Sequence, residues 1–159
     1  MSEKPKLAMY WASSCGGCEI SVLGIGDKIL TVDEIFDIVF FPCIADFKYE
    51  DVRNYPDGYI DVCLFNGAIR SSENEEMAHL MRQKSKVLVA YGSCAYEGCI
   101  PALSNLTSKE ATFDAIYLNN PTTENPDGVV PQTVTKVPEG ELEIPLFYNT
   151  VKSLDQVVS

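Results

Sequence analysis

The chain has 159 residues, of which 46% are hydrophobic, which is enough for one globular core and too short to argue for two. Its 23 acidic and 12 basic residues give a formal net charge of −11, which disfavours nucleic-acid partners because contacts to phosphates need clustered Lys and Arg. The longest apolar stretches fall short of the roughly 20 residues of a membrane span, so we expect none.

The N-terminus and the cysteine content indicate the compartment. The first six residues run directly into an apolar segment, without the hydrophobic region and cleavage site of a signal peptide and without a twin-arginine pair. We therefore expect a cytoplasmic protein. Thiols are kept reduced there, so the six cysteines predict metal or redox chemistry rather than disulfides, although some of them can be ordinary buried residues.

Apolar segments in the first hundred residues predict buried strands, which cover residues 7–11, 37–41, 59–67 and 86–91. Between these strands the sequence indicates helical turns. Residues 19–23 favour the start of a helix, and residues 46–57 form a polar connection with room for one or two turns.

The clearest helix signal is a capping box, in which Ser72 and Glu75 precede apolar residues at helical spacing. Strands that alternate with helical crossovers predict an α/β domain with an open, doubly wound parallel sheet and helices on both faces. We assign residues 1–118 to this domain. Prolines interrupt the pattern after it, so residues 119–159 are expected to form an extended segment packed on the domain or on a partner, with another helix beginning in residues 150–158.

Cysteines follow the first and the fourth predicted strands. Cys15 and Cys18 come after the first strand in a Cys-Gly-Gly-Cys segment, and Cys94 and Cys99 come after the fourth. In an open parallel sheet, ligands collect at the carboxyl ends of the strands, so we expect the two loops to converge. Thiolates there could bind an iron–sulfur cluster or zinc, and the C-x-x-C spacing also serves dithiol redox catalysis.

The other candidate residues are given structural roles. Cys43 and Cys63 lie at the end of a strand and inside one, and are expected to pack. The lone His79 falls within the capped helix and has no partner motif, so it receives no role. Cys99 stays open as a ligand, a spectator or a thiol near the site.

Two segments carry a resemblance to a known family. Residues 11–21 (WASSCGGCEIS) and 92–101 (GSCAYEGCIP) closely resemble the small subunit of [NiFe] hydrogenases, and the nearest branch is the F420-non-reducing type. The likeness extends over essentially the whole chain and implies a flavodoxin-like fold. The chain is also similar, more distantly, to the cluster-bearing subunit of respiratory complex I, which has adjacent cysteines where this chain has Cys-Gly-Gly-Cys.

The resemblance implies an electron-transfer subunit of an oxidoreductase complex. A hydrogenase large subunit would carry the nickel–iron centre, and this chain would hold the adjacent [4Fe–4S] cluster through Cys15, Cys18 and Cys94. Glu19 matches an acidic residue that the family associates with proton transfer. Electrons from H2 oxidation would leave toward further iron–sulfur or flavin subunits, in this branch usually those that serve heterodisulfide reductase.

The chain departs from the family pattern in two places. Cys99 stands where the family's loop commonly has a second glycine, which adds a thiol beside the ligand set. The fourth ligand is expected in a Gly-Cys-Pro motif, which does not occur up to Ser159. We therefore expect the sequence to be the N-terminal portion of a longer chain; otherwise Cys99 substitutes or the site is incomplete.

Two alternatives belong to other classes of protein. A thioredoxin-like dithiol oxidoreductase also follows a strand with a CxxC motif, but that fold has a βα unit before its active-site strand, and only about six residues precede the first strand here. A zinc-stabilised interaction module would use Cys15, Cys18, Cys94 and Cys99 as a tetrahedral site. A parallel-sheet core of this size is expected to fold without such a metal.

Overall fold

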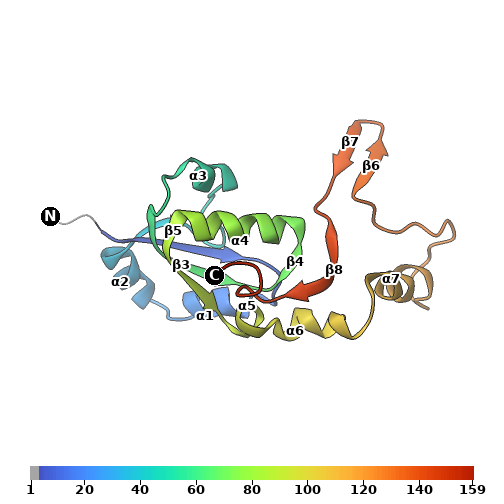
Figure 1. Cartoon of the computed structure of the whole chain (residues 1–159), viewed down its shortest axis with the longest axis horizontal. Coiled ribbons are helices and arrows are strands. Elements are labelled where there is room, and N and C mark those ends of the chain that lie inside the picture. The colour runs from blue at the N-terminus through green and yellow to red at the C-terminus, as the bar shows by residue number, and fades with distance from the viewer. Residues whose placement is uncertain (1–3) are drawn as a thin grey trace.

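A four-stranded, all-parallel sheet forms the centre of the molecule in the computed structural model, which describes residues 4–159. The strand order is β2-β1-β3-β5, as in open doubly wound sheets (Figure 1). The predicted fold class and all the predicted strands are confirmed, with bounds of β1 Lys6–Trp11, β2 Asp37–Phe40, β3 Ile60–Asn66 and β5 Ser85–Tyr91.

The strand order creates a crevice at the carboxyl edge of the sheet. From β1 the chain passes to β2 on one side and then returns to β3 on the other, so the order reverses between β1 and β3. The register aligns the last residues of the three strands, because Trp11 pairs with Asn66 and Asn66 pairs with Tyr91. The chain segments that follow these three residues therefore start side by side at the carboxyl edge of the sheet.

Helices cover both faces of the sheet, as predicted. Figure 1 shows α3 and α4 on one face and α1 and α2 on the other. The helix predicted for residues 19–23 begins two residues earlier, and the polar connection contains the single short helix α3. The bounds are α1 Gly17–Leu23, α2 Lys28–Ile35, α3 Tyr49–Asn54, α4 Ser72–Lys84, α5 Ser93–Glu97 and α6 Cys99–Ala102.

The cap of α4 lies one residue before the predicted position. Ser71 is the capping residue, and its hydroxyl accepts a hydrogen bond from the Asn74 amide at 3.3 Å. The Ser72 hydroxyl instead accepts from the amide of Leu146 at 2.9 Å. The predicted capping box was therefore misplaced, because a segment more than 70 residues away recruits the second hydroxyl.

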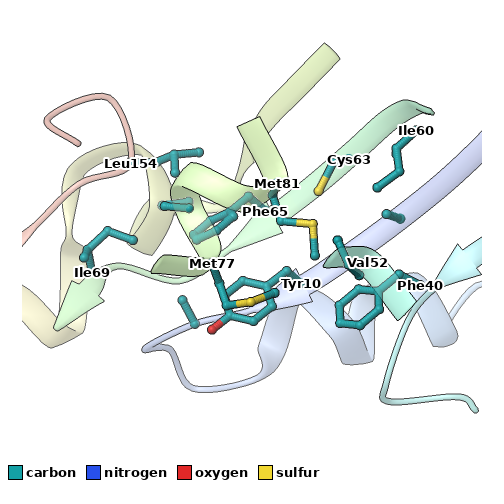
Figure 2. Close-up of a cluster of buried hydrophobic side chains, with 14 of the residues drawn as sticks. Tyr10, Phe40, Val52, Ile60, Cys63, Phe65, Ile69, Met77, Met81 and Leu154 are labelled. Atoms are coloured by element: carbon teal, nitrogen blue, oxygen red, sulfur yellow. The ribbon is translucent and has the colours of Figure 1, made fainter. Parts of the chain in front are cut away.

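The core lies between the sheet and α4 (Figure 2). Apolar side chains from β1, β2, β3 and α4 pack there with almost no exposed surface. This agrees with the unbroken apolar sequences of the strands, which are typical of a sheet covered on both faces. Cys63 is fully buried among them, and burial raises the pKa of its thiol to about 12. The largest fully buried members of this core are Tyr10, Phe40, Phe65, Ile60 and Ile69.

The C-terminal segment contains strands that the sequence did not indicate. β8 (Phe147–Lys152) pairs antiparallel with the short β4 (Ile69–Ser71), and β6 (Val134–Val137) and β7 (Gly140–Glu143) form a separate hairpin. The helix expected in residues 150–158 is therefore wrong. After β8 the amide of Leu154 donates to the carbonyl of Ala95 at 2.8 Å, and the Leu154 side chain enters the core.

The region between α6 and β6 contains only short helical turns within the described residues. These are η1 (Leu103–Leu106), α7 (Lys109–Phe113) and η2 (Asp114–Leu118). Across residues 4–159, no helix combines the length and the apolar character that crossing a bilayer would need.

Candidate functional site

Three cysteines lie where two strands reach the crevice. Cys15 and Cys18 belong to the loop after β1 and the first turn of α1, and Cys94 lies in the first turn of α5, directly after β5. Each turn relies on a glycine in the left-handed region, with φ values of 79° at Gly16 and 86° at Gly92. Residues with a Cβ rarely adopt this conformation, so glycine allows both chains to turn sharply at the sheet edge.

The two cysteine loops are in contact. A Cβ atom placed on Gly92 would lie 2.3 Å from Sγ of Cys18, so the thiol rests directly against the backbone that leads to Cys94. The hydroxyls of Ser21 and Tyr91 also hydrogen-bond at 3.1 Å and join α1 to the end of β5. The structure therefore places the predicted cysteines of both loops at one site.

The three thiols differ in exposure. Cys15 is exposed, Cys18 is partly exposed and Cys94 is buried. Burial raises the pKa of Cys94, the neighbouring thiols of Cys99, Cys15 and Cys18 raise it further, and a hydrogen bond from the Ile100 amide acts in the opposite direction. Burial also raises the pKa of Cys18. Metals bind cysteine as the thiolate, and the positive charge of a bound metal itself favours that form.

The thiols of both loops are soft donors, which suit an iron–sulfur cluster and also a zinc ion. No three His, Cys, Asp or Glu side chains are placed to hold one metal ion in the described part of the chain. A zinc ion with Zn–S bonds of about 2.3 Å draws its tetrahedral sulfurs to within roughly 3.8 Å of one another. An iron–sulfur cluster is larger and takes the same soft donors, so its thiolates stand further apart.

Cys99 occupies a backbone position that favours glycine. Its φ of 37° is the one positive value at a non-glycine residue in residues 4–159, and it follows Gly98 with φ of 85°. A side chain in the left-handed region costs about 1 kcal/mol. The position is therefore compatible with the glycine that the resemblance implies there, and the thiol of Cys99 is an addition to it.

Replacing Cys99 with glycine is expected to keep the metal content of the protein and to leave its stability unchanged or raised by about 1 kcal/mol. The reason is that the positive φ at this residue favours glycine. Iron analysis and chemical denaturation of the variant would measure both effects. Loss of bound metal in Cys99→Gly would contradict the prediction and would make Cys99 a ligand.

A buried carboxylate lies beside the cysteines. Glu19, the residue after Cys18, is 2% exposed, and Asn66 at the end of β3 is completely buried. The side-chain amide of Asn66 lies 2.7 Å from each carboxylate oxygen of Glu19 and donates to Ser14 Oγ at 2.9 Å. Sequence reasoning missed Asn66, although its position at the end of the third strand, aligned with Trp11, could have indicated it.

Glu19 also lines a cavity of about 360 Å³ whose wall includes none of the three clustered cysteines. Cys43, which was expected to be a packing residue, is exposed and faces the same cavity; the pKa of its thiol is raised by burial and then by Glu19. His79 lies on α4 and is not among the residues that line this cavity. The rest of the cavity wall is apolar and aromatic and consists of Met9, Tyr10, Trp11, Phe41, Pro42, Phe47 and Tyr49.

Replacing Asn66 with leucine is expected to lower the free energy of unfolding by about 2–4 kcal/mol, because Asn66 is the hydrogen-bond donor found for the buried Glu19 carboxylate in the described residues. Urea denaturation at neutral pH would measure the loss. The double variant Glu19→Leu/Asn66→Leu is the control, and it should recover part of the loss by removing the unpaired charge. Equal stability of Asn66→Leu and the unsubstituted protein would contradict this role.

The chain is similar to known proteins over most of its length. The family described as "NADH ubiquinone oxidoreductase, 20 Kd subunit" matches residues 15–148. An iron-sulfur subunit of the F420-non-reducing hydrogenase of Archaeoglobus profundus is 42% identical over 154 residues, which are 96% of this chain and 48% of the relative. A subunit of the F420-non-reducing hydrogenase of Methanothermobacter thermautotrophicus is 35% identical over 158 residues, which are 99% of this chain and 47% of the relative.

A solved structure shares the fold. A chain of an NAD+-reducing [NiFe]-hydrogenase in the H2-reduced state superimposes with a TM-score of 0.81 and 24% sequence identity, and the match covers 99% of this chain and 79% of that chain. At this identity the likeness concerns the fold alone. The chain spans about half the length of the curated relatives that it matches.

Proposed function

Because the chain belongs to the family of hydrogenase subunits related to the 20 Kd subunit of NADH ubiquinone oxidoreductase, we propose that it is an electron-transfer subunit that holds a [4Fe–4S] cluster. The observation that carries the proposal is the contact between the loop of Cys15 and Cys18 and the loop of Cys94. A cluster at this point supplies one-electron transfer. In this account, residues 1–118 form the cluster-binding domain, and residues 119–159 form a segment that packs on it.

Cys15, Cys18 and Cys94 would hold the cluster as thiolates. Gly16 and Gly92 would let the two loops approach it, and the Ile100 amide donates a hydrogen bond to the Cys94 sulfur, which favours the thiolate form. The strained backbone at Cys99 weighs against this residue as the fourth ligand, so we leave that ligand outside the set of Cys15, Cys18, Cys94 and Cys99.

Glu19 is the group that we propose for proton transfer. Its carboxylate is held in place by Asn66, lies next to a proposed ligand, and faces a cavity of about 360 Å³ that is lined mainly by apolar side chains. A buried carboxylate at such a wall can accept or release a proton where water has little access. The hydrogen bonds from Asn66 would keep the carboxylate oxygens of Glu19 in one orientation beside this cavity.

The proposed partner is a hydrogenase large subunit that carries a nickel–iron centre. Large apolar side chains are exposed around the cysteine edge, on the loops and helices that lead to and from the thiols. A surface of this kind is typical of a protein–protein interface. The exposed residues are Trp11, Ile20, Leu23, Tyr96, Ile100 and Leu103.

The complex would pass electrons from H2 oxidation toward further iron–sulfur or flavin subunits, including heterodisulfide-reductase-type subunits, and would work in the cytoplasm. The thioredoxin-like dithiol alternative is disfavoured because all four strands of this sheet are parallel, the pattern of the doubly wound fold that the sequence predicted. A zinc site remains an outcome of the metal analysis described below.

The proposal is tested by purifying the full-length protein anaerobically with the chains that accompany it and recording EPR spectra under H2 and under argon. We expect a reduced iron–sulfur signal from this chain under H2 and none under argon. A complex that oxidises H2 with an artificial acceptor while this chain contributes no reduced signal would contradict the proposed electron path.

A further inference from the structure

Arg70 lies close to the first cysteine loop. The chain after β3 pairs with the chain after β1, because the Ala12 amide donates to the Asn66 carbonyl at 2.7 Å and Ser13 forms an antiparallel bridge with Ala68. The bridge is antiparallel, so Arg70 in β4 and Cys15 lead away from it in opposite directions along the two neighbouring segments. What brings the two residues together is a pocket whose wall includes both of them.

The Arg70 side chain is held in one place. The residue is 8% exposed, and its guanidinium carbon lies 4.1 Å from the centroid of the Phe147 ring. Phe147 stacks in turn on Phe113, with ring centroids 5.9 Å apart. Nη1 of Arg70 donates a hydrogen bond to the Ser104 hydroxyl. A planar guanidinium that is stacked and hydrogen-bonded in this way has little freedom to move toward solvent.

The positive charge of Arg70 has no carboxylate partner within the described residues. The ion pairs found there involve Lys48, Arg53, Lys84, Lys86 and Lys152. Burial is the one cause that shifts the pKa of Arg70, and it lowers it. A cation that is removed from water without an anion is costly, so a negative group is expected to face it.

Arg70 lines a pocket together with Cys15, a proposed cluster ligand. The pocket has a volume of about 320 Å³, and the polar groups in its wall are Arg70, the thiol of Cys15 and three serine hydroxyls. Among the described residues, none in this wall carries a carboxylate, so the Cys15 sulfur is the one group there that can carry negative charge. The other lining residues are Ser13, Ser14, Ser104, Ile100, Pro101 and Phe147.

We propose that Arg70 is the resident positive charge of the thiolate site and that it raises the reduction potential of a cluster held through Cys15. This inference rests on the proposed function. Reduction adds an electron to a centre that is already anionic, and a fixed cation beside it favours the reduced state. The effect decreases with distance, and the water that reaches the exposed Cys15 weakens it.

The test is a redox titration of the complete anaerobic complex, followed by EPR, with iron content measured on each sample. In Arg70→Gln, the ratio of reduced to oxidised cluster at the wild-type midpoint is expected to fall at least about threefold. Arg70→Lys keeps the charge and should titrate close to wild type. Arg53→Gln is the matched control, because it removes the same charge from an exposed position on α3 and should leave the midpoint unchanged.

Three outcomes would overturn the proposal. An Arg70→Gln complex with normal iron content and the wild-type midpoint would show that the charge does not act on the cluster. Release of the large subunit from both Arg70→Gln and Arg70→Lys, with an unchanged midpoint in the remaining chain, would show that the guanidinium anchors a partner's carboxylate. A wild-type complex without iron would instead refute the proposed function itself, and the inference would fall with it.

A second variant decides the matter if Arg70→Gln does not fold. Ser104→Ala removes the hydroxyl that orients Nη1 but leaves the charge and the stack on Phe147 in place. It is expected to shift the midpoint in the same direction as Arg70→Gln and by a smaller amount. An unchanged midpoint in Ser104→Ala, with Arg70→Gln unfolded, would overturn the proposal.

Discussion

Replacing Cys94 with alanine is expected to abolish the iron–sulfur EPR signal of the protein and most of its bound iron, while the parallel sheet stays folded. Cys94 is the buried member of the three thiols and joins the second loop to the site. It lies in the five-residue helix α5, at the edge of the sheet, so the loss of its side chain should cost only about 1 kcal/mol of stability. Iron and sulfide analysis, EPR and circular dichroism would separate the two effects.

Cys43→Ala is the matched control for this experiment. Cys43 is an exposed thiol that faces the cavity beside Glu19 and does not belong to either cysteine loop. Its removal should leave iron content and EPR spectrum unchanged. An EPR spectrum of reduced Cys94→Ala that matches the wild type would refute the assignment of Cys94 as a ligand.

The variant Gly92→Ala is expected to lower both stability and metal content, although it removes no ligand. The φ of 86° alone costs about 1–2 kcal/mol for a residue with a Cβ. The new methyl group would also lie 2.3 Å from Sγ of Cys18, so the loop or the thiol must move. We expect the free energy of unfolding to fall by about 2–4 kcal/mol. Bound iron should fall with it, because the Cys18 sulfur is displaced.

Gly26→Ala isolates the contribution of backbone strain. Gly26 has a similar φ of 66°, but a Cβ there would meet no atom within 4 Å. Its replacement should cost only about 1 kcal/mol and leave iron content at the wild-type level. If Gly92→Ala and Gly26→Ala lost the same stability and kept the same iron content, the close approach of Cys18 to the β5–α5 turn would not contribute to metal binding.

The features that the sequence predicted well depend on local pattern. Unbroken apolar runs located β1, β2, β3 and β5, because strands of a parallel sheet are buried on both faces. The meeting of the two cysteine loops followed from the same pattern, since the carboxyl ends of parallel strands share an edge. The resemblance added which thiols would act as ligands.

The features that the sequence did not predict depend on contacts between distant segments. β8 pairs with the short strand β4, which no local pattern indicates. Just before β8, the Leu146 amide donates to the Ser72 hydroxyl, and Ser71 rather than Ser72 caps α4. Asn66 and Arg70 carry no motif. Their importance follows from the buried Glu19 carboxylate and from the pocket beside Cys15, which exist only in the folded chain.

The metal content of the anaerobically purified full-length protein tests the central claim most directly. A cubane cluster held through Cys15, Cys18 and Cys94 predicts about four iron and four sulfide per chain and no zinc. Zinc as the sole metal, or a metal-free protein in which Cys15 and Cys18 titrate as a two-electron dithiol, would contradict the account.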